Sequence, residues 1–258
     1  MNTETNSWVE VRGVRIGEGI PKICVPIVGT TRDEILAAAK SFESVKKDVV
    51  EWRADWFNGV FDFAQVEALM TELRQVLGNT PVLFTFRTAN EGGEKAIEPA
   101  AYAELNKRAA ATRLIDLVDV EAFTGDEVVR DIIESAHESG VVVVASNHDF
   151  EKTPEKDEIV RRLRKMQELD ADIPKIAVMP QSRKDVLTLL SATEEMVSEY
   201  ADRPIITMSM SATGLISRLC GECFGSALTF GAVGKASAPG QMNASDLSEI
   251  LNLIHTSL

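Results

Sequence analysis

The sequence is poor in cysteine and in basic residues. Its three cysteines, Cys24, Cys220 and Cys223, are too few and odd in number for a disulfide framework. Lys and Arg total 27 against 40 Asp and Glu, so the formal net charge is −13. Because so acidic a chain repels nucleic acids and anionic membrane surfaces, we expect neither as a partner.

Long apolar runs are also missing. No stretch reaches the roughly 18 apolar residues of a membrane-spanning helix, so no membrane span is expected. The first seven residues lack the basic and apolar regions of a secretory signal peptide. These absences predict a cytoplasmic protein.

Short apolar runs alternate with amphipathic stretches along the whole chain. The runs with strand character are Lys22–Val28, Asp48–Trp52, Val82–Arg87, Ile115–Glu121, Gly140–Ser146, Pro174–Met179, Ile205–Met210 and Ala227–Val233. The helical stretches are Arg32–Val45, Phe63–Leu77, Ala100–Thr112, Asp126–Ser139, Asp157–Leu169, Arg183–Tyr200, Thr213–Phe224 and Ser245–His255. This alternation predicts an α/β protein with a single domain over residues 1–258, folded as a (β/α)8 TIM barrel.

Two turn signals refine this prediction. Residues 8–16 alternate around Arg12-Gly13, which predicts a β-hairpin that closes the N-terminal face, or bottom, of the barrel. Thr153-Pro154 predicts a helix start with Thr153 as its cap. A doubly wound sheet is the structural alternative, but no glycine fingerprint follows the first strand.

Charged residues gather at the ends of the predicted strands. Because strand side chains alternate between faces, Glu51, Arg53, Arg87, His148 and Lys175 are expected to point into the barrel near its C-terminal mouth. Buried charges must be paired or bind something. A structural salt-bridge cluster is one explanation, and an active site is the one that also accounts for the lysine and the histidine.

Lys175 lies in an apolar run with a proline near each end, typical of a buried strand. A desolvated lysine loses proton affinity and can attack a carbonyl to form an imine. The alternative is that Lys175 opens the strand and extends its ammonium group to water. Asp119 and Glu121, at the end of the fourth predicted strand, are expected to brace Lys175 or the arginines.

The neighbouring residues suit imine chemistry. His148, with an ordinary pKa near neutrality, can take a proton from the carbon beside an imine and return it to a leaving group. Glu91, in the loop after the third strand, could hold the tautomer of the imidazole. Arginines in an acidic protein indicate an anionic substrate, most simply a carboxylate.

Several ordered motifs together resemble one enzyme family. They are Glu51-Trp52-Arg53-Ala54-Asp55, Phe84-Thr85-Phe86-Arg87-Thr88-Ala89-Asn90-Glu91-Gly92-Gly93-Glu94, Ser146-Asn147-His148-Asp149-Phe150, Asp170-Ala171-Asp172-Ile173-Pro174-Lys175-Ile176-Ala177, Ile205-Ile206-Thr207-Met208-Ser209-Met210, Gly214-Leu215-Ile216-Ser217-Arg218 and Ala236-Ser237-Ala238-Pro239-Gly240-Gln241. From about Pro21 to the C-terminus, the chain resembles type I 3-dehydroquinate dehydratase.

The resemblance implies an enzyme of the shikimate pathway, without metal or cofactor, that dehydrates 3-dehydroquinate to 3-dehydroshikimate through a Schiff base. By position, Lys175 matches the imine-forming lysine, His148 the general acid/base and Glu91 the partner of that histidine. The substrate-binding positions are Arg218 for the carboxylate, Glu51, Arg53 and Arg87 for the hydroxyls and the order of the site, Ser237 and Gln241 for a covering loop, and Met208, Met210 and Phe150 for the apolar wall. The resemblance also implies a homodimer whose ligand is a small molecule.

Two other functions use similar residues. A class I Schiff-base aldolase-like barrel shares the lysine chemistry, but a phosphorylated substrate would call for an anion-binding glycine loop near the eighth strand. The segment 231–241 carries Ser-Ala-Pro-Gly-Gln instead. A non-catalytic barrel that binds a carboxylate metabolite would not need an inward lysine beside a histidine.

Overall fold

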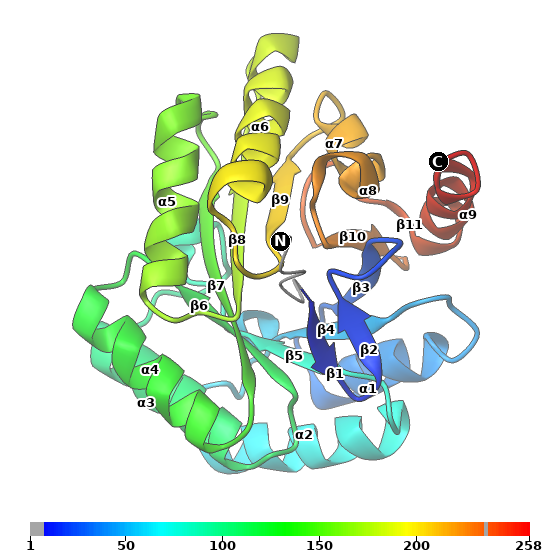
Figure 1. Ribbon diagram of the computed structural model, residues 1–258. Helices are drawn as coiled ribbons and strands as arrows, with labels where there is room; N and C mark the ends of the chain where they lie inside the picture. Colours follow the sequence, from blue (N-terminus) through cyan, green and yellow to red (C-terminus); the bar gives the residue numbers. More distant parts are fainter. Residues whose placement is uncertain (1–7, 235–236) are drawn as a thin grey trace.

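The computed structural model describes residues 8–234 and 237–258, and these form a parallel barrel surrounded by helices (Figure 1). The sheet order is β11-β10-β3-β4-β5-β6-β7-β8-β9. Its strands are β3 (Lys22–Ile27), β4 (Val49–Arg53), β5 (Val82–Thr85), β6 (Leu117–Glu121), β7 (Val142–Asp149), β8 (Ile173–Val178), β9 (Ile206–Ser209), β10 (Leu228–Ala232) and β11 (Met242–Asn243). The (β/α)8 barrel predicted from the sequence is confirmed.

Helices follow the strands and cover the outside of the barrel. They are α1 (Arg32–Ser41), α2 (Phe63–Leu77), α3 (Pro99–Ala111), α4 (Asp126–Glu138), α5 (Lys156–Glu168), α6 (Arg183–Glu195), α7 (Leu215–Leu219), α8 (Gly221–Phe224) and α9 (Ala244–His255), with short turns η1 (Ala54–Trp56), η2 (Ala89–Glu91) and η3 (Met196–Tyr200). None of the helices in the described part of the chain is long and apolar enough to cross a membrane.

Alternation along the strands divides the apolar residues between two cores. Val50 and Trp52 pack between the sheet and the helices. Val49 and Leu83 belong to a second cluster inside the barrel. Because alternate side chains point to opposite faces, Glu51 and Arg53 follow Val49 on the inner face, toward the C-terminal mouth.

The barrel closes between β9 and β10 with little backbone pairing. The only bridge between these two segments in the described residues joins Ile205 to Ser226. The Ser226 hydroxyl accepts from the Thr207 backbone N–H at 3.0 Å and donates to the Thr207 carbonyl at 3.2 Å. This side chain therefore supplies hydrogen bonds that a neighbouring backbone would otherwise make.

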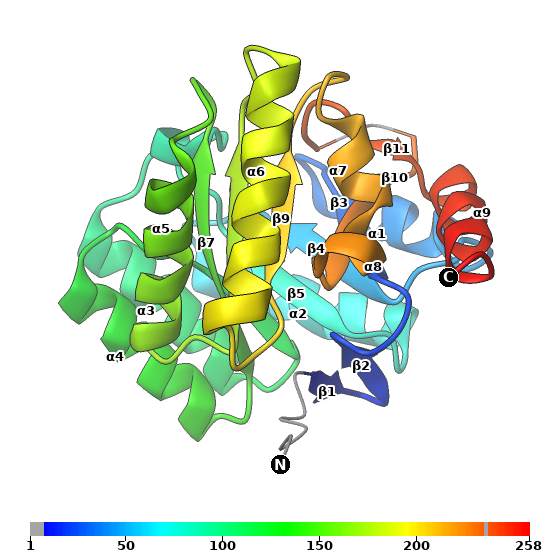
Figure 2. The same cartoon turned by 45° about the horizontal axis from the view of Figure 1, so that its top comes forward.

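The predicted hairpin closes the bottom of the barrel (Figure 2). Strands β1 (Val9–Val11) and β2 (Val14–Ile16) pair antiparallel around Arg12 and Gly13, whose φ angles of 49° and 81° suit a two-residue hairpin turn. Val11 and Ile16 join the apolar cluster inside the barrel. Arg12 donates from Nε to Asp116 Oδ1 at 2.6 Å, which ties the turn to the segment before β6.

Two helix predictions are wrong in detail. Helix α5 begins at Lys156 with Glu155 as its N-cap and no side-chain cap, and the Thr153 hydroxyl donates instead to the Met179 carbonyl. The predicted helix 213–224 is two short helices that meet at Cys220. The break turns the chain back toward β10 and leaves Arg218 at the end of α7.

Candidate active site

A cavity opens among the residues at the carboxyl ends of the strands. All twelve site residues predicted from the sequence line it: Glu51, Arg53, Arg87, Glu91, His148, Phe150, Lys175, Met208, Met210, Arg218, Ser237 and Gln241. Gly92, Ala177, Phe230, Ala238 and Pro239 complete the lining. Lys235 and Ala236, which belong to the predicted covering segment, lie outside the described residues.

Lys175 lies inside the barrel and does not extend to water. The residue is 3% exposed, in strand β8. Its Nζ lies 3.0 Å from Asp119 Oδ2 and 4.8 Å from the centre of the Phe230 ring. The amine thus has one carboxylate, one aromatic face and the cavity around it. A carbonyl compound bound in the cavity could reach this nitrogen.

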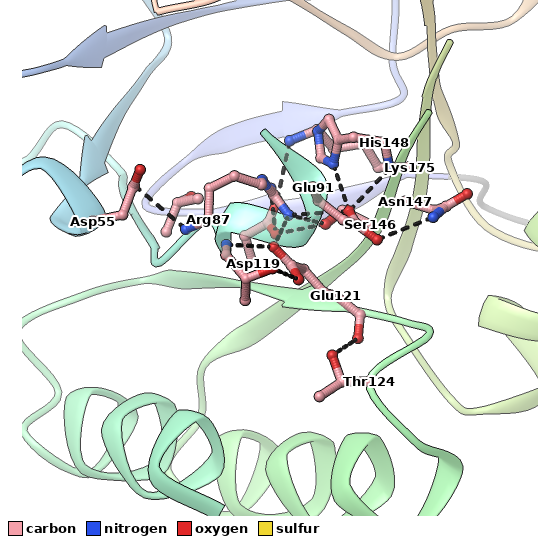
Figure 3. Close-up of polar contacts among 12 residues, drawn as sticks. Asp55, Arg87, Glu91, Asp119, Glu121, Thr124, Ser146, Asn147, His148 and Lys175 are labelled. Atoms are coloured by element: carbon pink, nitrogen blue, oxygen red, sulfur yellow. Dashed lines mark hydrogen bonds and ion pairs between the residues drawn. The ribbon is translucent and has the colours of Figure 1, made fainter. Parts of the chain in front are cut away.

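Asp119 connects Lys175 to a buried ion network (Figure 3). Its Oδ1 accepts from Arg87 Nη2 at 2.7 Å and from the Ser146 hydroxyl at 2.6 Å. Burial alone would raise the pKa of Asp119, but the charges of Arg87 and Lys175 hold it well below its usual range. Asp119 is therefore a permanent anion that can stabilise positive charge on the lysine nitrogen.

His148 is held by Glu91 at two points. Glu91 Oε2 lies 2.9 Å from His148 Nδ1 and also accepts from the His148 backbone N–H at 2.9 Å. Nδ1 is therefore occupied, and Nε2 is the ring nitrogen left for a ligand. Phe150 stacks at 6.4 Å between ring centres on the imidazole.

The turn after Glu91 requires glycine. Gly92 ends η2 with a φ of 81°, a conformation that other residues rarely adopt. A Cβ at this position would also come within 2.4 Å of the Phe150 ring. The left-handed turn at Gly92 therefore lets the chain leave η2 while the Glu91 carboxylate faces His148 near the end of β7.

Burial shifts the proton affinities of this pair in opposite directions. Burial raises the pKa of Glu91 to about 8, against the opposing charge of Arg87. Burial and the charges of Arg87 and Lys175 lower the pKa of His148 well below its usual value. When the pair loses a proton, Glu91 is a carboxylate that accepts from Nδ1–H, and Nε2 is free to act as a base.

The arginines differ in their partners. Arg53 forms two hydrogen bonds of 2.8 Å with the carboxylate of Asp55. Arg87 contacts Asp119 at 2.7 Å and Glu121 at 3.0 Å. These two arginines are already neutralised by carboxylates. These ion pairs therefore hold the side chains of the cavity wall in fixed positions.

Arg218 is a buried cation for which no ion pair is found within the described residues. It is 2% exposed, and its hydrogen bonds go to Met208 Sδ at 3.6 Å and to the Pro239 carbonyl at 3.2 Å. Its buried Nε has no partner among the described atoms. Burial lowers the pKa of Arg218 to about 10, so it remains charged at neutral pH. An anion in the cavity would supply the missing partner.

Three further predicted polar residues line the cavity, Glu51, Ser237 and Gln241. Glu51 accepts from the Thr85 hydroxyl at 2.9 Å. In the segment after β10, the Ser237 backbone donates to Gln241 Oε1 at 2.9 Å, and Gln241 Nε2 donates to the Ser237 hydroxyl at 3.0 Å. This reciprocal pair gives the described part of the loop a closed turn that borders the cavity.

The sequence did not assign functions to Asp55, Asn147 or Phe230. Asp55 is fully buried against Arg53, Asn147 donates to Glu91 Oε1 at 3.0 Å, and Phe230 covers Lys175. Strand alternation could have placed Phe230 on the inner face of β10. The contact made by Asn147 could not be inferred in that way, because alternation places this residue opposite to His148.

The described residues show no triad of His, Cys, Asp or Glu side chains that could hold a metal ion. Cys220 is buried and Cys223 exposed, both as free thiols. Burial raises the pKa of Cys220 to about 11, which makes it a poor metal ligand at neutral pH.

Comparison with known proteins gives consistent matches. Residues 23–258 match the family model for type I 3-dehydroquinase. A 3-dehydroquinate dehydratase from Clostridioides difficile (strain 630) is 55% identical over 250 residues, which cover 97% of this chain and 98% of the relative. One from Listeria monocytogenes serotype 4b (strain F2365) is 57% identical over 247 residues, covering 96% and 98%.

Solved structures agree with these matches. The type I 3-dehydroquinate dehydratase from Clostridium difficile, with covalent modified comenic acid, superposes with a TM-score of 0.95 at 55% identity and covers 97% of this chain and 99% of that one. The enzyme from Geobacillus kaustophilus HTA426 gives a TM-score of 0.94 at 38% identity, covering 96% of each chain.

The fold and these matches define a (β/α)8-barrel enzyme of the hydro-lyase class. Within that class, the chain belongs to the type I 3-dehydroquinase family.

Proposed function

We propose that this protein dehydrates 3-dehydroquinate to 3-dehydroshikimate in the shikimate pathway, through an imine on Lys175 and without metal or cofactor. The amine of Lys175 attacks the ketone, and loss of water gives the iminium. The positive charge on nitrogen then lies beside Asp119, 3.0 Å from Nζ in the free protein. This carboxylate stabilises the iminium, which acidifies the adjacent carbon.

His148 carries the proton through the elimination. Its Nε2 takes the proton from the carbon next to the iminium carbon, and the electron pair forms an enamine. The enamine expels the hydroxyl group one carbon further along, and the protonated histidine delivers its proton to that oxygen as water. Hydrolysis of the conjugated iminium returns Lys175 and releases the enone, so one molecule of water is lost in total.

The observation that carries this proposal is the buried Lys175 in a cavity shared with Arg218, for which the described residues provide no ion pair. A ketone that bears a carboxylate satisfies both groups at once. The structure of a relative that is 55% identical has been solved with covalent modified comenic acid, and the name of this ligand identifies it as an acid. A covalent modification that involves an acid in the structure of a related chain supports covalent chemistry with an acidic ligand here.

One assay tests the reaction. Addition of 3-dehydroquinate to the purified protein should produce the ultraviolet absorbance of the conjugated enone of 3-dehydroshikimate. A class I aldolase would instead release two carbon fragments without that chromophore, and a non-catalytic binding barrel would leave the substrate unchanged. Either of those results would refute the proposed dehydration.

The binding roles follow the contacts in the cavity. We assign Arg218 to the substrate carboxylate, and Glu51, Arg53 and Arg87 to the ring hydroxyls and the order of the site. Ser237 and Gln241 cover the substrate, while Met208, Met210 and Phe150 form the apolar wall. All of these residues line one cavity.

Arg218→Met should lower kcat/KM for 3-dehydroquinate by about 10- to 100-fold, chiefly through KM, because a charge-assisted hydrogen bond contributes roughly 1.5–3 kcal/mol. Methionine fills a similar volume and leaves no unpaired charge in the wall. The control is a substrate analogue with a carboxamide in place of the carboxylate. Arg218→Met should change kcat/KM for that analogue little. An equal loss of kcat/KM on both substrates would show that Arg218 does not bind the carboxylate.

The family resemblance also suggests a cytoplasmic homodimer in which the whole chain is one catalytic domain. Sedimentation velocity should then give a mass near twice the 28.2 kDa of the chain. A species at the mass of one chain at all concentrations would exclude the dimer.

A further inference from the structure

Strand β7 carries a buried amide on the side that faces the helices. Ser146 contacts Arg87 and Asp119 inside the barrel, whereas Val143 and Ala145 pack in the outer core between strands and helices. Asn147 follows the outer residues in this alternation and is only 9% exposed. Because a buried polar side chain is costly unless it is hydrogen-bonded, its contacts call for an explanation.

Asn147 connects the outer helix α5 to Glu91. Its Nδ2 donates to Glu91 Oε1 at 3.0 Å, a contact visible in Figure 3. Its Oδ1 accepts from Arg162 Nη1 at 2.9 Å. Arg162 is held in turn by Glu158, through Nε to Oε1 at 2.7 Å. A continuous line of hydrogen bonds therefore runs from the surface of α5 to the carboxylate that holds His148.

The chemistry of the guanidinium group decides which way this amide points. Arginine can only donate hydrogen bonds, so the oxygen of Asn147 must face Arg162 and its NH₂ group must face Glu91. An N–H donated to a carboxylate favours the ionised form of that carboxylate. Ionised Glu91 accepts from Nδ1–H of His148 and leaves a lone pair on Nε2 toward the cavity.

We propose that Arg162 and Asn147 are positioning residues that favour the ionised form of Glu91 and thereby the tautomer of His148 that can act as a base. The proposal rests on the proposed role of His148 in proton transfer. Neither residue lines the cavity. Arg162 Nη1 also lies 3.8 Å from Asp149 Oδ2, but the hydrogen-bonded route from Arg162 and Asn147 to the imidazole of His148 runs through Glu91.

Other charged groups surround Glu91 and His148. They are Arg53 at the end of β4, Arg87 after β5, Asp119 and Glu121 on β6, and Lys175 on β8. Within the described residues, no hydrogen bond or ion pair joins any of these five groups to Arg162 or to the Asn147 side chain. Variants at Arg162 and Asn147 therefore leave this electrostatic background in place.

Helix α5 offers a matched control for Arg162. Arg161 pairs with the same Glu158, through Nε to Oε2 at 2.7 Å, and it lies on the same helix. It makes no contact with Asn147 among the described residues. Arg161→Gln therefore removes the same charge from the same helix and from the same Glu158, but leaves the amide of Asn147 oriented and the contact between Arg162 and Asp149 in place.

The first test observes the imidazole itself. Nitrogen-15 NMR across the titration of the Glu91–His148 pair distinguishes Nδ1–H from Nε2–H. The chain has only three histidines, and the signals of His148 are those that vanish in His148→Ala. In Arg162→Gln the amide can turn over, so a population of the Nε2–H tautomer should appear. Arg162→Lys, which can also only donate, should restore the Nδ1–H form, and Arg161→Gln should match the wild type.

The second test observes turnover. Arg162→Gln should lower kcat roughly 3- to 10-fold with KM unchanged. This loss is at or below the roughly 10- to 100-fold that is usual when a partner that orients a functional group is removed. Asn147→Asp keeps an acceptor for Arg162 but presents a carboxylate oxygen to Glu91. The added negative charge favours the form of the Glu91–His148 pair that has not yet lost its proton. The apparent pKa of the acid limb in the pH profile of kcat should therefore rise by about one pH unit.

The two tests separate this proposal from a purely structural role and from the function itself. If Arg162 and Asn147 only fasten α5 to β7, both variants lower the melting temperature while the tautomer and the pH profile stay as in the wild type. That result would overturn the proposal. The tautomer is measured without turnover, so it stands even if His148→Ala remains active, which would instead refute the proposed mechanism.

Discussion

Lys175→Arg is expected to abolish dehydration, with a loss of at least about 10⁴-fold in kcat, because the imine route disappears with the amine. Arginine keeps the positive charge that faces Asp119 at 3.0 Å, so the buried ion network retains its charge balance. Its guanidinium is not a usable nucleophile. The melting temperature of the variant should accordingly stay near that of the wild type while the enone absorbance fails to appear.

Borohydride trapping identifies the nitrogen directly. Reduction in the presence of substrate should convert the imine to a stable amine and inactivate the wild-type enzyme. Mass spectrometry should place the added mass on the peptide that contains Lys175. Lys107→Arg serves as the control, because Lys107 pairs with Asp131 on the surface and is 32% exposed. It should be trapped like the wild type, and a label on any lysine other than Lys175 would refute the assignment.

His148→Ala is expected to lower kcat by about 10²- to 10⁴-fold, the usual contribution of a general acid or base. Lys175 remains able to form the imine, so borohydride should trap an intermediate that this variant accumulates. In the wild type, kcat should rise with pH on the acid side, as the Glu91–His148 pair loses the proton that blocks Nε2. In His148→Ala that limb should disappear.

Two comparisons give the histidine prediction its control. His137→Ala removes a histidine that pairs with Asp172 at 2.9 Å from helix α4, outside the cavity, and it should have wild-type kinetics. Glu91→Ala should lose only about tenfold, because Glu91 orients the imidazole and does not itself transfer the proton. Near-normal turnover in His148→Ala would remove this residue from the mechanism.

The sequence predicted most of the barrel because its signals are local. Apolar runs and amphipathic stretches define strands and helices from neighbouring residues, and α2 (Phe63–Leu77) has the predicted bounds. One error concerns a side chain whose partner is distant in the sequence. Thr153, predicted to cap α5, lies outside the cap position, and its hydroxyl donates to the carbonyl of Met179, which lies 26 residues further along the chain.

The candidate site was predictable to the same extent. Period-two alternation was enough to place Glu51, Arg53 and Lys175 on the inner face, and the family motifs supplied Arg218, Ser237 and Gln241. What alternation could not supply was the partner of each charge. Arg87 has Asp119 and Glu121, which lie more than 30 residues further along the chain, whereas no ion pair is found for Arg218 within the described residues. Neither local sequence indicates this difference.

The sequence by itself therefore determined the order of strands and helices, the inner and outer faces of each strand, and the residue types that meet at the mouth of the barrel. Tertiary structure alone decided which of them touch. Lys175 contacts Asp119, which lies 56 residues away in the sequence. Asn147, on β7, forms hydrogen bonds with both Arg162 and Glu91. Such contacts depend together on strand register, the path of the loops and the side-chain rotamers. Local sequence propensity specifies none of these three.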